Sequence, residues 1–151
     1  MSSSGLRRRS RELALQGLYE RQLADSPVET VYADLVGSAG YRRADPIYFA
    51  ELWRGAAADY AALLARVAVH LDRSPASLSP VERAVLVIGA WELVNRLEIP
   101  YRVVINEAVE LAKQYGGTDG HKYVNGVLDK FAADVRADEI AALARERGAA
   151  V

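Results

Sequence analysis

The stretch SPVERAVLVIGAWELV, residues 79–94, decides the fold. It begins with the signals of a helix start: a serine that can cap, a proline suited to the first helical position and a glutamate three residues after the serine. The rest is apolar nearly all round the helix, at Val81, Ala84, Val85, Leu86, Val87, Ile88, Trp91, Leu93 and Val94. A helix with so little polar surface is predicted to lie at the centre of the fold.

The segments on both sides of this stretch also show helical periodicity. Apolar residues recur every three or four positions, and no window alternates apolar and polar residues over the length of a strand. We expect a first helix over about residues 6–23, a long third helix over residues 45–71 and a last, alanine-rich helix over residues 138–147. The tetrapeptide SPVE occurs at residues 26–29 as well as at 79–82, and predicts the same capping box at the start of a second helix.

These patterns predict an all-α fold of about seven helices in two packed helical bundles. We expect a single domain over residues 1–151, with one subdomain over about residues 6–73 and a second over about residues 79–135. The split falls near residues 73–78, where Asp72-Arg73-Ser74-Pro75 ends the long helix. The tail, residues 136–151, has only a thin apolar face, which predicts a loosely docked or frayed helix.

The composition excludes several classes of function. The chain has no cysteine, which rules out disulfides and zinc–thiolate sites and favours a reducing cytoplasm. No apolar run approaches the roughly 18 residues that a membrane span needs. The two histidines, His70 and His121, do not have the spacing of a zinc site, and neither a nucleophile elbow nor a phosphate loop is present. We therefore expect no enzyme activity, no metal and no cofactor.

Four arginines crowd five positions near the start of the first helix, at Arg7, Arg8, Arg9 and Arg11. Cations at this end of a helix are disfavoured by the helix dipole, and they also repel one another. One interpretation is that they are solvated and partly compensated by Glu12. The other is that they meet an anionic partner, most plausibly the phosphate backbone of a nucleic acid. Because the net charge of the whole chain is −1, any such affinity has to come from a local patch.

A second candidate surface is the start of the helix in HKYVNGVLDK, residues 121–130. Free backbone N–H groups at a helix start can receive a phosphate, and Lys122 stands beside them. Tyr123 could stack on a base, although it could equally belong to the core while Lys122 is solvated. Asp119 brings a negative charge to this point, as a helix cap or as a hydrogen-bond acceptor for a base. Gly126 interrupts the helix, and we expect the close approach of a neighbouring helix to explain it.

Three blocks of the sequence resemble the NusB family of bacterial transcription antitermination factors. They are RRRSRELALQGLYERQL (residues 7–23), SPVERAVLVIGAWEL (79–93) and IPYRVVINEAVELAKQYGGTDGHKYVNGVLDK (99–130), so the resemblance covers about residues 7–130. It implies an all-helical fold and no enzymatic activity. Members of the family bind the boxA element of nascent RNA as a heterodimer with NusE, a small-subunit ribosomal protein. With other Nus factors on RNA polymerase, the pair supports processive transcription of ribosomal RNA operons.

The resemblance also implies positions for the two interfaces. The RNA surface would comprise Arg7, Arg8, Arg9, Arg11, Asp119, Lys122 and Tyr123, with His70 at a position where relatives often carry an aromatic residue. The NusE surface would draw on the helix that starts at SPVE, with Glu82 as its main residue. We expect a cytoplasmic protein that is a monomer or a homodimer when free.

Two other functions are compatible with a helical chain of this kind. One is an RNA-binding module that serves a ribosomal RNA methyltransferase, but such modules accompany a catalytic domain with a cofactor site, which this sequence lacks. The other is a helical protein-interaction scaffold or homodimer without specific RNA binding. A preference for boxA over scrambled RNA, and a gain in affinity from NusE, would distinguish the antitermination factor from the scaffold.

Overall fold

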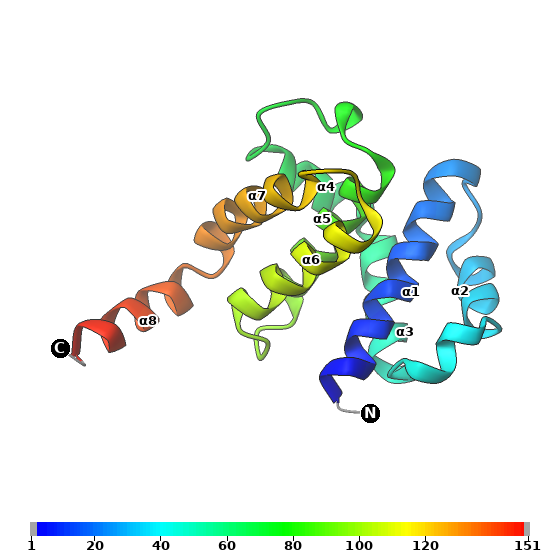
Figure 1. The fold of residues 1–151 in the computed structure, drawn as a ribbon, viewed down its shortest axis with the longest axis horizontal. Helices are drawn as coiled ribbons and strands as arrows, with labels where there is room; N and C mark the ends of the chain where they lie inside the picture. The colour runs from blue at the N-terminus through cyan, green and yellow to red at the C-terminus, as the bar shows by residue number, and fades with distance from the viewer. Residues whose placement is uncertain (1–2, 150–151) are drawn as a thin grey trace.

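Helices account for all the regular structure in the computed structural model, which describes residues 3–149 (Figure 1). The eight α-helices of this range are α1 (Ser3–Ala24), α2 (Val28–Val36), α3 (Pro46–Ala58), α4 (Tyr60–Ala68), α5 (Pro80–Asn95), α6 (Tyr101–Tyr115), α7 (Gly120–Val135) and α8 (Ala137–Ala149). Two short 3-10 helices, η1 (Ala39–Arg43) and η2 (Pro75–Ser77), lie in the connections. The prediction of an all-α fold is confirmed.

Helix α5 is the central element, as its composition predicted. Every residue from Ala84 to Leu93 is buried, and the helix contacts α1, α3, α4, α6 and α7. Its start is the predicted capping box: the Ser79 hydroxyl accepts a hydrogen bond from the Glu82 N–H at 3.1 Å, and the Glu82 carboxylate accepts one from the Ser79 N–H at 3.0 Å. Gly89 lets α7 approach closely, because a Cβ there would lie 2.7 Å from a methyl carbon of Leu128.

The helices pack as two bundles that meet at α5. Helices α1, α2 and α3 contact one another together with η1, and α6 and α7 form the most extensive pair of the other group (Figure 1). Helix α4 packs mainly on α5 and also touches α7. The division of the chain into subdomains over residues 6–73 and 79–135 stays a prediction.

The long helix predicted over residues 45–71 is wrong, because the structure breaks it at Asp59. The φ and ψ angles of Asp59 are −98° and 15°, so α3 ends at Ala58 and α4 begins at Tyr60. The two halves have different neighbours: α3 packs chiefly on α1, whereas α4 packs on α5. A straight helix could not follow both surfaces, although the apolar stripe continues through the break to the buried residues Leu63 and Val67. This break accounts for eight helices instead of seven.

The capping box predicted at residues 26–29 is also absent. Pro27 occupies the N-cap position of α2, and no side chain caps the helix. Glu29 instead pairs with Arg54 of α3 at 3.0 Å, and the carbonyl of Ser26 accepts a hydrogen bond from Arg21. Glu29 thus pairs with a residue of another helix, whereas Glu82 in the same tetrapeptide closes the capping box of α5.

Helix α8 extends away from the end of α7 (Figure 1). At the junction, the buried Arg136 donates hydrogen bonds to the carbonyls of Leu93 and Ile99 and pairs with Glu139. The predicted tail, residues 136–151, is thus helical from Ala137 to Ala149, and residues 150–151 lie outside the described range. Within that range, none of the helices combines the length and the apolar character needed to cross a membrane.

Candidate nucleic-acid and protein interfaces

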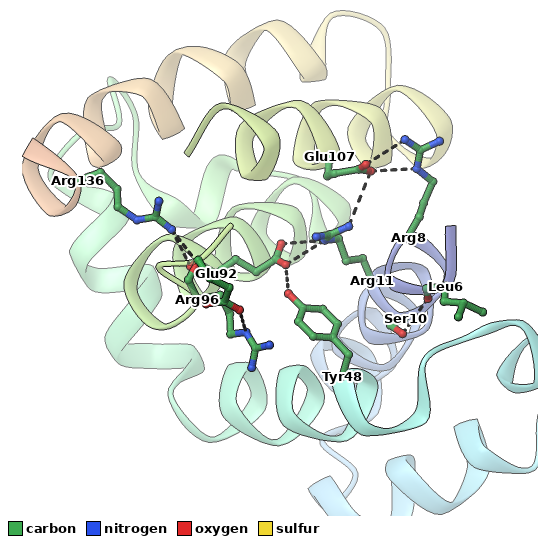
Figure 2. A network of polar contacts seen from close by, with 10 residues as sticks. Leu6, Arg8, Ser10, Arg11, Tyr48, Glu92, Arg96, Glu107 and Arg136 are labelled. Atoms are coloured by element: carbon green, nitrogen blue, oxygen red, sulfur yellow. Dashed lines mark hydrogen bonds and ion pairs between the residues drawn. The ribbon is translucent and has the colours of Figure 1, made fainter. Parts of the chain in front are cut away.

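The arginine cluster of α1 divides into one buried and three surface side chains. Arg11 is 3% exposed, and its Nε lies 2.9 and 3.0 Å from the two carboxylate oxygens of Glu92 on α5. The hydroxyl of Tyr48 donates a further hydrogen bond to Glu92 (Figure 2). We therefore correct the prediction that Arg11 contacts RNA: its guanidinium is enclosed and committed to a buried ion pair.

The charges of this buried network stabilise one another. Burial alone would lower the pKa of Arg11, but the Glu92 carboxylate outweighs that effect, and the pKa lies above its usual value. Burial, together with the same carboxylate, also raises the pKa of the Tyr48 hydroxyl, which stays protonated and able to donate. Helix α1 is thus joined to α3 and α5 by charge-assisted hydrogen bonds.

Arg7, Arg8 and Arg9 remain at the surface, but each has a neighbour within the chain. Arg8, with a side chain 55% exposed, binds Glu107 of α6 through two hydrogen bonds of 3.0 and 2.9 Å, and this carboxylate raises the pKa of Arg8 (Figure 2). Arg9 pairs with Glu12 at 2.8 Å, so Glu12 partly compensates the charge of the cluster, as one of the two interpretations expected. The Arg7 guanidinium lies 4.5 Å from the centre of the Tyr48 ring. These pairs orient the three cations along the exposed side of α1.

The second predicted surface brings His70, Lys122 and Tyr123 together. They line a hollow of about 190 Å³ with Asp72, Gly126, Val127 and Lys130, formed by α7 and the segment after α4. The Tyr123 hydroxyl donates a hydrogen bond to Asp72 at 3.0 Å, and the Arg73 guanidinium lies 4.1 Å from the centre of the tyrosine ring. Hydrogen bonds from Arg73 and Tyr123 hold the pKa of the Asp72 carboxyl below its usual value.

Asp119 occupies the N-cap position of α7 without capping it. Its φ is 65°, in the left-handed region, and its side chain makes no cap hydrogen bond. The carboxylate lies 3.3 Å from the Nζ of Lys122 instead, so the two charges partly offset each other at the helix start. Asp119 and Lys122 are both exposed, within reach of an incoming ligand.

The explanation predicted for Gly126 is wrong. A Cβ built on this residue would meet no atom within 4 Å, so no neighbouring helix requires the glycine. The backbone of α7 is instead open to solvent at this point, beside the hollow that His70 and Tyr123 line.

Glu82, the residue predicted to contact NusE, is half-buried in the capping box of α5. Beside this helix start lies a groove of about 540 Å³, lined by Arg9, Glu12, Leu13, Leu15, Gln16, Tyr19, Gly40, Arg43, Val81 and Tyr115. Tyr19 and Tyr115 expose 39% and 45% of their surface there. The sequence gives no sign of this groove, because Tyr19 follows the same helical period as Leu15 and Leu18, which are buried.

The family of the chain follows from comparison with known proteins. The model of the NusB family matches residues 8–133. The transcription antitermination protein NusB of Paraburkholderia phymatum is 56% identical over 141 residues, which are 93% of this chain and 97% of that protein. The transcription antitermination protein NusB of Ralstonia nicotianae is 56% identical over 136 residues, covering 90% of this chain and 88% of that protein.

Solved structures give the same assignment. T. maritima NusB matches with a TM-score of 0.74 and 28% identity, covering 83% of this chain and 89% of that one. A crystal structure of the antitermination factors NusB and NusE in complex with double-stranded RNA matches with a TM-score of 0.70 and 25% identity, covering 82% and 93%. The match to the family model and the sequence identity to these relatives show that the chain belongs to the NusB family.

Proposed function

We propose that this chain is a transcription antitermination factor that binds boxA RNA together with NusE. One observation carries the proposal: over 93% of its length the chain is 56% identical to an antitermination protein of the NusB family. The likeness to a NusB solved with NusE and RNA supports both partners. With other Nus factors and RNA polymerase, the pair promotes processive transcription of ribosomal RNA operons. This role needs no catalysis, and it is carried out in the cytoplasm, where bacterial transcription takes place.

The RNA is bound by the exposed side of α1 and by the start of α7. Arg7, Arg8 and Arg9 supply cations for the phosphate backbone, which gives affinity without sequence preference. Lys122 and Tyr123 supply a further cation and an aromatic ring, the combination that single-stranded RNA favours. His70 and Asp119 complete this end of the surface, while Arg11 acts from inside by fixing α1 on α5.

NusE docks in the groove beside the start of α5. Partly exposed tyrosine side chains beside apolar residues are typical of the centre of a protein interface. Glu82 stands at the same helix start, and a carboxylate can accept further hydrogen bonds while it caps the helix. Arg9 belongs to the groove and to the arginine cluster, so the two partners meet at this residue.

The proposal is tested by assembling the complex from purified components. The chain, NusE and a boxA RNA are mixed and separated by size-exclusion chromatography, with a scrambled RNA of the same composition as the control. We expect one ternary complex with boxA and none with the scrambled RNA. Equal elution profiles for the two RNAs, without a ternary complex, would favour the helical scaffold or homodimer that does not bind RNA specifically.

A further inference from the structure

Gly126 is a glycine that packing does not explain. Glycine in the middle of a helix is less stable than alanine, because it loses more backbone freedom on folding. Gly17, Gly55 and Gly89 also lie in helices, and a Cβ at each would come within 3 Å of Trp53, Trp91 or Leu128. Those three glycines are required by close helix contacts, whereas a Cβ at Gly126 meets nothing within 4 Å. Within the described chain the open space over Gly126 therefore has no occupant.

The space over Gly126 belongs to a hollow whose walls carry aromatic rings and cations. His70 is held in place by Asp134, with 3.0 Å between Nε2 and Oδ2, and its ring meets Phe131 edge-on. Tyr123 is held from the other direction by its hydrogen bond to Asp72. His70 is thus fixed by residues outside the hollow, and Tyr123 by a residue that lines it.

The charged groups of the hollow suit a phosphorylated ligand with a base. Lys122 and Lys130 flank Gly126 along α7, and Lys130 forms no side-chain hydrogen bond or ion pair with the residues that the structure describes. One carboxylate oxygen of Asp72 accepts hydrogen bonds from Tyr123 and Arg73, and the other oxygen can accept further ones. Stacking rings, two ammonium groups, of which Lys122 is paired with Asp119, and a carboxylate acceptor together are the chemistry that recognises an unpaired nucleotide.

We propose that one unpaired nucleotide of the bound RNA lies against the backbone of α7 at Gly126, in the room that the missing side chain leaves. The inference rests on the proposed RNA binding and adds a subsite to it. His70 and Tyr123 form the walls of this subsite, Gly126 its floor, and Lys130 contacts the neighbouring phosphate. The glycine makes room for the ligand at the expense of helix stability.

The test compares Gly126→Ala and Gly126→Leu with the unmodified chain by fluorescence anisotropy of labelled boxA and scrambled RNAs. Because nothing crowds the new methyl group, Gly126→Ala is expected to raise the melting temperature, by about 2–4 °C. The same variant should bind boxA RNA more weakly, and Gly126→Leu should lose about 5- to 150-fold in affinity, the range for losing one stacked base. Gly148→Ala is the matched control, since Gly148 is also helical and open but lies in α8 outside the hollow.

The outcomes separate the subsite from the proposed function. Weaker RNA binding with a raised melting temperature supports the subsite, whether or not boxA is preferred. Unchanged affinity in both Gly126 variants, with the unmodified chain still selecting boxA, overturns the subsite and leaves the function intact. If the unmodified chain binds neither RNA, both are overturned.

An abasic scan of the RNA then locates the nucleotide. Each position of boxA is replaced in turn by an abasic nucleotide, and binding is measured with the unmodified chain and with Gly126→Leu. The subsite predicts one position whose abasic form weakens binding to the unmodified chain but causes no additional loss in the variant. Losses that simply add at every position would contradict a shared site.

Discussion

The Nε of Arg11 lies 2.9 Å from Oε1 of Glu92, and both side chains are buried at the junction of α1 and α5. Glu107 of α6 binds Arg8 on the surface and lies 4.0 Å from Arg11, so one line of charges runs from the core to the exposed side of α1 (Figure 2). The clustered arginines of α1 therefore have different roles. Arg11 fixes the helix, and Arg7, Arg8 and Arg9 remain at the surface, where the proposed function places the RNA.

Arg11→Ala is expected to destabilise the fold by about 3–5 kcal/mol, because it leaves the Glu92 carboxylate buried without its partner. The free energy of unfolding is measured by urea denaturation. Arg54→Ala serves as the control, since Arg54 forms an exposed pair with Glu29, and its loss should leave the midpoint nearly unchanged. Equal, small effects of the two substitutions would show that the buried pair does not hold α1 in place.

The double variant Arg8→Ala/Arg9→Ala is expected to weaken RNA binding and to flatten its dependence on salt. Each phosphate contact to a single strand contributes a slope of about −0.7 in a plot of log affinity against log salt concentration. The loss of two contacts should therefore reduce the slope by about 1.4. Titrations at several salt concentrations measure it, and an unchanged slope would mean that these side chains do not reach the backbone.

Tyr123→Ala is expected to lose about 5- to 150-fold in affinity for boxA RNA, because the stacking ring is removed. Tyr123→Phe keeps the ring and removes only the hydrogen bond to Asp72, so it should bind nearly as well as the unmodified chain. Anisotropy titrations of both variants distinguish a stacking role from a hydroxyl role. A large loss in the phenylalanine variant would assign the contact to the hydroxyl group and its carboxylate partner.

The helical fold was predictable because local signals and the tertiary structure agree in most segments. At the start of α5, the serine, proline and glutamate make the bonds that their spacing indicates, and the apolar residues after them are buried. At residues 26–29 the same four residues form no capping box, and Glu29 pairs with Arg54 instead. Local reasoning also missed the break at Asp59, since the apolar stripe continues across it while the helices that it packs on change.

The residue types of the candidate surfaces could be predicted from the sequence, but their geometry could not. Arg11 precedes Leu15 and Leu18 by one and two helical turns, so the period of α1 placed it on the buried face, and Glu92 within an apolar helix needed a cation. The clustering of the four arginines points the other way, toward a shared anionic ligand. His70 and Tyr123 line the same hollow because of the way α4 and α7 pack. No local sequence pattern predicts that packing. At Gly126 the sequence predicts a close helix contact, but the structure has open space there.

Glu82→Gln is expected to weaken NusE binding by about tenfold or more while the fold remains stable, because glutamine can still accept the hydrogen bond from the Ser79 N–H but carries no charge. Ser79→Ala tests the opposite half of the capping box. It should lower the free energy of unfolding by about 1 kcal/mol and leave the charge at Glu82 in place. Isothermal titration with NusE, together with urea denaturation, measures both effects. Unchanged NusE affinity in Glu82→Gln would remove Glu82 from the interface.

Tyr19→Ala is expected to weaken NusE binding by about 30-fold or more, since truncating a tyrosine at the centre of an interface costs about 2 kcal/mol or more. Binding of RNA without NusE should change little, because Tyr19 lies outside the proposed RNA surface. Leu23→Ala is the matched control: Leu23 is an exposed apolar residue of the same helix, and it does not line the groove. Equal losses from both substitutions would place NusE elsewhere on α1.

The central claim is that one chain joins boxA RNA to NusE, and the coupling between the two ligands tests it most directly. The affinity for labelled boxA and scrambled RNA is measured by anisotropy at near-physiological salt, over increasing concentrations of NusE. We predict that NusE tightens binding of boxA by about 5- to 150-fold, and that boxA tightens binding of NusE by the same factor. Equal, weak binding of both RNAs at every concentration of NusE would contradict the account.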